Sequence, residues 1–197
     1  MRFDAILFDF DGVLADTEPI HYQCWVEILA PYGVGLDWDY YQRECIGVSD
    51  KLMVERVAPP GEFDRIWPRY AEKQALFRER MAAASPFLEE TARLIAEVAA
   101  THKLAVVSSS GRAEIEPPLI AAGIRRYFET LVCGREAGEL KPAPDPYLRA
   151  AMVLGAKRPL VVEDSAAGEA SGKAAGFEVL RVTSAGAVPV ELRRLLS

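Results

Sequence analysis

Residues 5–12 of the chain read AILFDFDG, an apolar run that leads into two aspartates, Asp9 and Asp11, and a glycine. A short apolar run without polar alternation is typical of a strand that is buried on both faces of a parallel sheet. Ligands of such sheets bind beyond the carboxyl ends of the strands. We therefore predict a buried first strand, residues 5–8, with functional acids at its end.

From about residue 84 onward, apolar runs alternate with helical segments. Strands spaced by helices imply βαβ crossovers, so the predicted fold class is α/β, a doubly wound parallel sheet with a Rossmann-like core. Pro117 and Pro118 are expected in the first turn of their helix or to shorten it. Asp145 is expected to cap the next helix, with Pro146 in its first turn. The predicted strands are residues 104–107, 130–133, 160–162 and 179–182, and the predicted helices between them end before Gly123, before Gly155 and at Gly176.

Residues 17–83 contain no strand-like run. Apolar residues there repeat at helical spacing, and Thr17 and Ser49 are candidate N-caps. We therefore predict a catalytic core of residues 1–16 and 84–197, with a helical insert of residues 17–83.

The composition excludes several classes of protein. Hydrophobic residues make up 50% and charged residues 26% of the 197 positions, which excludes disordered and collagen-like chains. The net charge of −6 disfavours binding of nucleic acid or of an anionic membrane over the whole surface. Neither is expected as a partner.

Three widely spaced cysteines, Cys24, Cys45 and Cys133, form no C-x-x-C pair. This argues for a reducing compartment and against a zinc site. The opening stretch carries acids inside its apolar run, so we expect no signal peptide. No apolar run approaches the roughly 18 residues of a membrane-spanning helix. We expect a soluble, cytoplasmic protein.

Polar side chains follow four of the predicted strands and should converge on one edge of the sheet. Carboxylates clustered in a partly dry cleft repel one another and need a cation. Oxygen ligands favour Mg²⁺, a lysine suits a phosphoryl oxygen, and a carboxylate can attack phosphorus. The residue types alone therefore indicate Mg²⁺-dependent phosphoryl transfer. The residues concerned are Asp9 and Asp11, Ser108 to Ser110, Lys141, and Glu163 with Asp164.

Four motifs resemble, in order, those of the haloacid dehalogenase superfamily. They cover nearly the whole chain, and their spacing and flanking strands agree with the superfamily pattern. The helical insert directly after the first motif resembles the cap of the β-phosphoglucomutase-like branch. The motifs are ILFDFDGVL at 6–14 with Asp16-Thr17, LAVVS at 104–108, KPAPDPY at 141–147, and VVEDSAAG at 161–168 followed by AAG at 174–176.

The resemblance implies roles for the polar residues of the core. Asp9 would attack phosphorus and ligate Mg²⁺. Asp11 would protonate the leaving oxygen and later deprotonate the attacking water, and its backbone carbonyl would also ligate the metal. Asp164, with Glu163, would complete the metal site, and Lys141 would offset the charge on Asp9 and on the phosphate.

The resemblance also implies contacts with the substrate. Ser108 would hydrogen-bond the transferring phosphoryl group, and its neighbours Ser109 and Ser110 are further candidates for this contact. His21 and Lys73 match cap positions that face the acid/base aspartate in β-phosphoglucomutase-like proteins. For both, a solvated helix face is the alternative interpretation.

Three functions fit these residues. The first is a phosphatase that hydrolyses a small phosphorylated metabolite such as a sugar phosphate, the second a sugar phosphomutase, and the third a phosphate-accepting or binding domain without turnover. The insert disfavours the third, because a cap serves an enzyme that excludes water or selects a small substrate. A dehalogenase is disfavoured because cleavage of a carbon–halogen bond needs neither a leaving-group acid nor a metal.

The loop at residues 46–50 of the insert distinguishes the first two functions. It reads IGVSD, where β-phosphoglucomutase carries a lysine before its Gly-Val-Ser and an arginine after it. Ile46 and Asp50 replace these cations, and Lys51 would point about 100° away on a helix. A second phosphate would be repelled, which favours the phosphatase. The sequence predicts neither the metabolite nor the oligomeric state.

Overall fold

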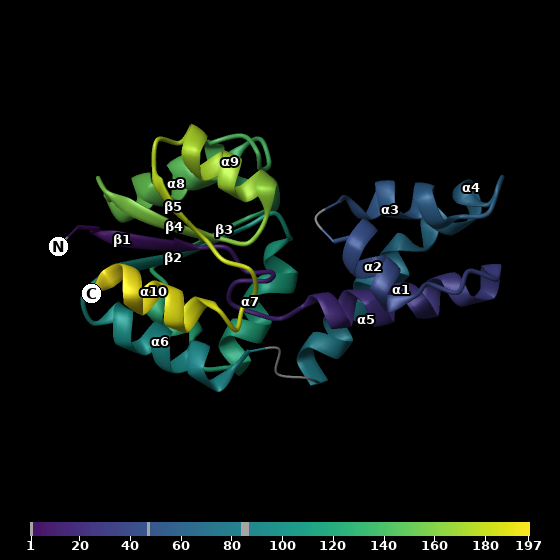
Figure 1. Cartoon of the computed structure of the whole chain (residues 1–197), viewed down its shortest axis with the longest axis horizontal. Helices are drawn as coiled ribbons and strands as arrows, with labels where there is room; N and C mark the ends of the chain where they lie inside the picture. Colours follow the sequence, from purple (N-terminus) through teal and green to yellow (C-terminus); the bar gives the residue numbers. More distant parts are fainter. Residues whose placement is uncertain (1, 47, 84–86) are drawn as a thin grey trace. The chain divides into compact units, whose positions relative to one another are not determined.

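The computed structural model describes residues 2–46, 48–83 and 87–197. The chain divides into two compact units. The core unit, Met1–Asp16 with Ser85–Ser197, contains a sheet, and the helical unit, Thr17–Ala84, is built of helices (Figure 1).

The core unit is built on one five-stranded sheet with the order β3-β2-β1-β4-β5, and every neighbouring pair is parallel. Strand β1 is therefore flanked on both sides, with Leu7 in register with Ala105 and Val161. All four of its residues are fully buried, as its unbroken apolar sequence predicts. The strands are β1 (Ala5–Phe8), β2 (Lys103–Ser108), β3 (Thr130–Cys133), β4 (Pro159–Glu163) and β5 (Glu178–Arg181).

Helices cover both faces of this sheet, which confirms the predicted doubly wound α/β fold. Helices α8 and α9 lie on one face, and α6 and α10 lie on the other (Figure 1). The apolar face of α8 packs Tyr147, Ala150 and Leu154 against the sheet residues Leu7 and Val107. The helices are α6 (Glu89–Ala99), α7 (Arg112–Ala121), α8 (Asp145–Leu154), α9 (Ala166–Ala174) and α10 (Val188–Leu196).

Two predictions about helix starts in the core were wrong. Helix α7 runs through Pro117 and Pro118 instead of beginning at them. The prolines remove two backbone hydrogen bonds, but the turn that contains them is held by the buried side chains of Ile115 and Leu119. Helix α8 begins at Asp145 itself, with Pro144 in the N-cap position.

The helical unit has a core of its own. Trp25 and Leu29 of α1 pack there with Tyr41 of α2, Met53 of α3 and Ile66 of α4. The Ser49 side chain caps α3 by accepting a hydrogen bond from the Leu52 N–H, as predicted, whereas Thr17 takes the N-cap position of α1 without a capping bond from its side chain. The helices are α1 (Glu18–Leu29), α2 (Trp38–Glu44), α3 (Asp50–Val57), α4 (Phe63–Ile66) and α5 (Tyr70–Ala83).

No helix in the described part of the chain combines the length and the apolar character that crossing a membrane requires.

Candidate active site

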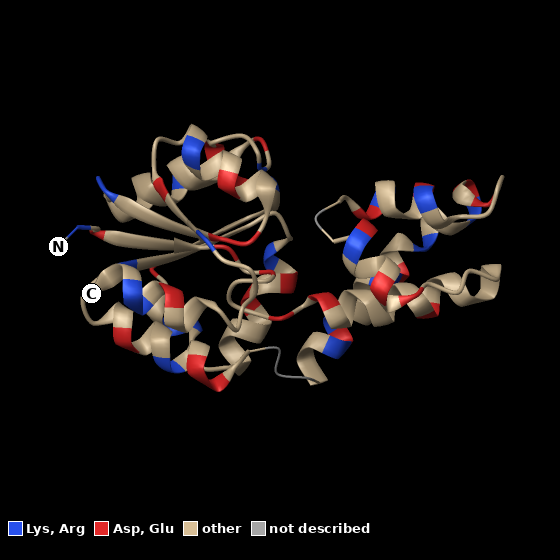
Figure 2. Cartoon of the chain, viewed as in Figure 1, with Lys and Arg blue, Asp and Glu red and all other residues tan. Residues whose placement is uncertain are grey.

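Acidic residues gather where β1 and β4 end, at the carboxyl edge of the sheet (Figure 2). Asp9 directly follows β1 and is 7% exposed, and Glu163 is the last residue of β4 and is fully buried. Because β1 and β4 are neighbours in register, the acids that end them lie side by side. A carboxylate oxygen from each of Asp9, Glu163 and Asp164 lies within 4.8 Å of the other two.

Lys141 joins this cluster from the loop after β3. Its Nζ lies 2.5 Å from Asp9 Oδ1 and 2.6 Å from Glu163 Oε1, and it also donates to the Val107 carbonyl oxygen at 2.9 Å. An ammonium group has three protons to donate, so all three are used. Burial lowers the pKa of Lys141, but Asp9 and Glu163 outweigh it and raise the pKa above its usual value, so the lysine is charged.

Asp9 and Glu163 share this cation. Burial raises the pKa of Asp9 well above its usual range, with Lys141 opposing the shift and the neighbouring charges of Glu163, Asp11 and Asp164 adding to it. Burial also acts to raise the pKa of Glu163, but Lys141 outweighs it, and the pKa is lowered. One lysine does not neutralise the acids, so the cluster favours a further positive charge.

Two glycines permit the close approach of these acids. A Cβ at Gly12, where φ is 72°, would lie 2.0 Å from Asp164 Oδ2. A Cβ at Gly168, in the first turn of α9, would lie 1.8 Å from the Glu163 carboxylate. Side chains at either position would displace the carboxylates.

The serines after β2 differ in their surroundings. Ser108 is 3% exposed, and its Oγ accepts a hydrogen bond from the Ser110 N–H at 3.1 Å. The Ser110 hydroxyl donates to Asp11 Oδ2 at 3.1 Å, and Ser109 is exposed. The structure thus brings Ser110 to the carboxylate of Asp11, a contact that the sequence does not indicate.

The donor set fits a hard divalent cation. Its ligand atoms are carboxylate oxygens, which Mg²⁺ prefers. Of the two oxygens of Asp9, only Oδ1 contacts Lys141 in a hydrogen bond. Asp9, Glu163 and Asp164, with the Asp11 carbonyl that the resemblance implies, are the residues predicted to hold the ion.

The two other predicted substrate contacts lie in the helical unit and contact each other. Lys73 Nζ is 2.8 Å from His21 Nδ1 and 3.1 Å from Asp50 Oδ2. Because an ammonium only donates, Nδ1 of His21 is the acceptor in this contact. Asp50 also accepts from Trp25 Nε1 at 2.8 Å, and the His21 ring stacks on Phe77 with 4.0 Å between ring centroids. Their contact with a substrate stays a prediction.

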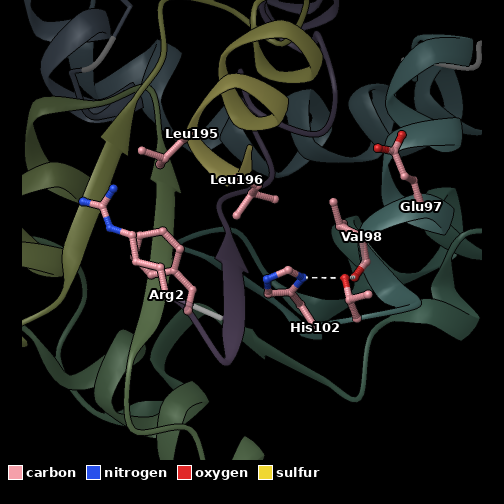
Figure 3. Close-up of a pocket in the computed structure, with 8 residues that line it drawn as sticks. Arg2, Glu97, Val98, His102, Leu195 and Leu196 are labelled. Atoms are coloured by element: carbon pink, nitrogen blue, oxygen red, sulfur yellow. Dashed lines mark hydrogen bonds between the residues drawn. The ribbon is translucent and has the colours of Figure 1, made fainter.

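A pocket of about 280 Å³ lies at the other edge of the core unit, where α6 and α10 end and β1 begins (Figure 3). His102 at its wall contacts Thr101 Oγ1 through Nδ1 at 2.9 Å, and Leu195 and Leu196 close one side. None of the residues that line it belongs to the four motifs. The chemistry gathers instead at the carboxyl edge.

A comparison with known protein families identifies the family of this chain. The model of one family, described as haloacid dehalogenase-like hydrolase, matches residues 6–182. The chain belongs to this family. Membership confirms the resemblance seen in the motifs and the prediction that the protein is an enzyme of the hydrolase class.

The proteins to which this chain is similar have different activities. The chain is 29% identical to the fructose-1-phosphate phosphatase YqaB of Escherichia coli, over 92% of this chain and 97% of the relative. It is 30% identical to a β-phosphoglucomutase of Mycobacterium bovis, over 96% of this chain and 86% of the relative. The crystal structure of CbbY from Rhodobacter sphaeroides in complex with phosphate matches with a TM-score of 0.71 and 30% identity, over 90% of this chain and 84% of that one.

Sequence reasoning assigned no role to Tyr147 or Gly168, although both lie in the motifs. Tyr147 is fully buried and donates its hydroxyl to Glu163 Oε1 at 2.7 Å. A buried tyrosine on the apolar face of a helix needs a hydrogen-bond partner for its hydroxyl. The sequence therefore contained a signal that Tyr147 contacts a polar group. The closeness of Gly168 to Glu163 has no such signal, because it depends on how α9 packs.

Proposed function

We propose that the protein is a Mg²⁺-dependent phosphatase that hydrolyses the monophosphate ester of a small metabolite, of the sugar-phosphate class, through a phosphorylated Asp9. The observation that carries this proposal is the contact of Lys141 with both Asp9 and Glu163, beside Asp11 and Asp164, at the carboxyl edge of the sheet. Relatives named as phosphatases of fructose 1-phosphate and of phosphorylated carbohydrates support the substrate class.

In the first step, an Asp9 carboxylate oxygen bonds to phosphorus and the ester P–O bond breaks. Asp11 gives its proton to the leaving alkoxide. In the second step, a water attacks phosphorus, Asp11 takes the proton of that water, and the bond between phosphorus and Asp9 breaks to release inorganic phosphate. Asp9 is regenerated, so atoms and charge balance over the cycle.

The other residues make these steps easier. Lys141, charged and buried, reduces the repulsion between the Asp9 carboxylate and the incoming phosphoryl oxygens. Ser108 offers a buried hydroxyl at the end of β2, and Ser110 orients Asp11 through their hydrogen bond. A bound Mg²⁺ would supply positive charge to the oxygens of the transferring group.

A sugar phosphomutase is the second candidate, because a β-phosphoglucomutase is among the relatives. A mutase must hold a second phosphate, and the cap loop offers an acid where that enzyme is expected to carry an arginine. Asp50 here is already paired with Lys73 and Trp25. Lys73, the cation in this group, is already paired with Asp50 and His21. Gly47, the second residue of this loop, lies outside the described residues.

A screen of phosphate release over a panel of phosphorylated metabolites, with Mg²⁺ and with excess chelator, tests the proposed activity. We expect release from sugar monophosphates only when the metal is present. No release from any ester in the panel would favour the third function, a phosphate-accepting or binding domain without turnover.

Phosphorus NMR of β-glucose 1-phosphate with a bisphosphate primer separates the two enzymatic candidates. A phosphatase releases inorganic phosphate and forms no glucose 6-phosphate. If glucose 6-phosphate appears faster than free phosphate, the protein is a mutase.

The free, buried cysteines support our further expectation of a reducing, cytoplasmic location.

A further inference from the structure

Tyr147 lies beneath the cluster of charged residues, in the first turn of α8. It is 0% exposed, its hydroxyl donates to Glu163 Oε1 at 2.7 Å, and its ring centroid lies 5.0 Å from Lys141 Nζ. Because an ionised carboxylate only accepts hydrogen bonds, the phenol is the donor in this contact.

The oxygens of the Glu163 carboxylate accept hydrogen bonds from five donors of the protein itself. Oε1 accepts from Lys141 at 2.6 Å and from Tyr147 at 2.7 Å. Oε2 accepts from the Asp164 N–H, the Ser165 N–H and the Ser165 hydroxyl, at 3.1, 3.1 and 3.0 Å. A carboxylate has about four lone-pair positions, so these five donors leave no lone pair for a cation that must approach to about 2.1 Å.

We propose that Tyr147 is a positioning residue that holds Lys141 in place through Glu163, and that Glu163 belongs to this hydrogen-bonded chain and not to the ligands of the metal. The inference rests on the proposed phosphatase function, because it concerns the same site. It assigns Tyr147 a role that the motifs do not indicate, and it moves Glu163 out of the ligand set predicted from the sequence.

The geometry explains how one hydroxyl affects the lysine. Lys141 has only three protons, and Asp9, Val107 and Glu163 take them. The position of Lys141 beside the nucleophile therefore depends on where Glu163 Oε1 lies. Tyr147 and the backbone at Ser165 hold the two ends of that carboxylate. Without the hydroxyl, Lys141 is the one hydrogen-bond donor left to Oε1 within the described part of the chain, and both side chains can shift together.

Tyr147→Phe removes the hydroxyl and keeps the ring under Lys141. Tyr41→Phe is the matched control, because Tyr41 is 5% exposed and donates its hydroxyl to a carboxylate, Glu18 Oε2, at 3.1 Å in the helical unit. Loss of an outer hydrogen-bond partner of a catalytic group typically lowers activity by about 10- to 100-fold. We expect kcat of the Tyr147→Phe enzyme to fall about tenfold or more, with KM changed by less than about threefold, and kcat of the control to stay within about twofold.

Binding of Mg²⁺ in the absence of substrate gives a readout without turnover. In calorimetric titrations we expect Asp164→Asn to lose most of its affinity for Mg²⁺ and Tyr147→Phe to keep it within about threefold. A Tyr147→Phe protein that weakens Mg²⁺ binding as much as Asp164→Asn would place Glu163 among the metal ligands and overturn the inference. Equal kcat in the Tyr147→Phe and Tyr41→Phe enzymes would overturn it as well.

A crystal structure of Tyr147→Phe separates this inference from the proposed function. If the wild-type enzyme releases no phosphate, the proposed function fails, but the structure still shows whether the hydroxyl positions the lysine. We expect Lys141 Nζ to move away from Asp9 Oδ1, from which it is 2.5 Å distant in the wild type. An unmoved Lys141 would contradict the inference whatever the activity.

Discussion

A methyl group added at Gly168 should damage stability and turnover together. Its Cβ would lie 1.8 Å from both Cδ and Oε1 of Glu163, and 2.2 Å from Oε2. No side chain accepts such distances, so either α9 moves away from the sheet or the Glu163 carboxylate leaves its five donors. Gly168 also donates its N–H to the Ser165 hydroxyl at 3.0 Å, which ties the first turn of α9 to the same carboxylate.

The magnitude follows from three effects. Overpacking a tight site costs about 1–3 kcal/mol, and each hydrogen bond to a charged group that is lost costs about 1.5–3 kcal/mol. Alanine is favoured over glycine inside a helix by about 0.5–1 kcal/mol, which offsets part of the loss. With a single lost bond, the net decrease in the free energy of unfolding for Gly168→Ala is about 3 kcal/mol.

Urea unfolding and phosphate-release kinetics check this prediction, with Gly172→Ala as the control. A Cβ at Gly172, one turn later in α9, would meet the apolar Val179 at 2.8 Å and Val161 at 3.2 Å. The control should therefore lose stability by overpacking but keep its kcat. Gly168→Ala should lose kcat by about tenfold or more because Lys141 loses its anchor.

A double-mutant cycle isolates the cause. In a Glu163→Ala background the colliding carboxylate is gone, so adding Gly168→Ala should cost less than about 0.5 kcal/mol. Gly168→Ala in the wild-type background with an unchanged free energy of unfolding and full kcat would refute the reasoning. So would equal costs of Gly168→Ala in both backgrounds.

Three further outcomes are expected. Asp9→Asn should keep its circular dichroism spectrum and lose at least about 10³-fold in turnover, because the nucleophile is removed. Asp11→Asn should stop turnover while calorimetry still detects Mg²⁺ binding. Near-normal rates in either variant would exclude the mechanism. Activity should need Mg²⁺ or Mn²⁺, disappear with chelator and be inhibited by Ca²⁺, whose larger coordination shell misplaces Asp9, and full activity in excess chelator would contradict the proposed role of the metal. Burial raises the pKa values of Cys24, Cys45 and Cys133, that of Cys133 to about 11. A thiol reagent at about pH 8 should therefore label the folded protein slowly and the urea-unfolded protein at once. Rapid labelling of the folded protein would show that the thiols are accessible.

The sheet and the place of its chemistry could be predicted from sequence because both depend on local patterns. The apolar run before Asp9 has no polar face, so it is best buried in a strand between two neighbouring strands. It forms the central strand of the sheet. Parallel strands end at one edge, so residues that follow strands in the sequence meet there whatever their separation. For this reason the structure brings Lys141 to Asp9, 132 residues away in the chain.

Other features depend on how helices pack, which local patterns do not specify. Pro117 and Pro118 lie inside α7 because the buried faces of that helix outweigh the hydrogen bonds that the prolines remove. The last strand lies one residue earlier than its apolar run predicts, at Glu178–Arg181, because pairing with β4 sets its register.

The same limit applies to the finest contacts of the site. Sequence alone places Glu163 beside Asp164 and makes it a metal ligand by analogy. The tertiary structure decides which donors reach its oxygens, because Tyr147 comes from α8 and Gly168 from α9, and each helix packs on the sheet through apolar residues that carry no information about Glu163. Asp50 likewise meets Lys73 and Trp25 only because α3, α5 and α1 pack together. Motifs thus determine which residues are present at a site, whereas the packing of whole elements determines what each charged atom contacts.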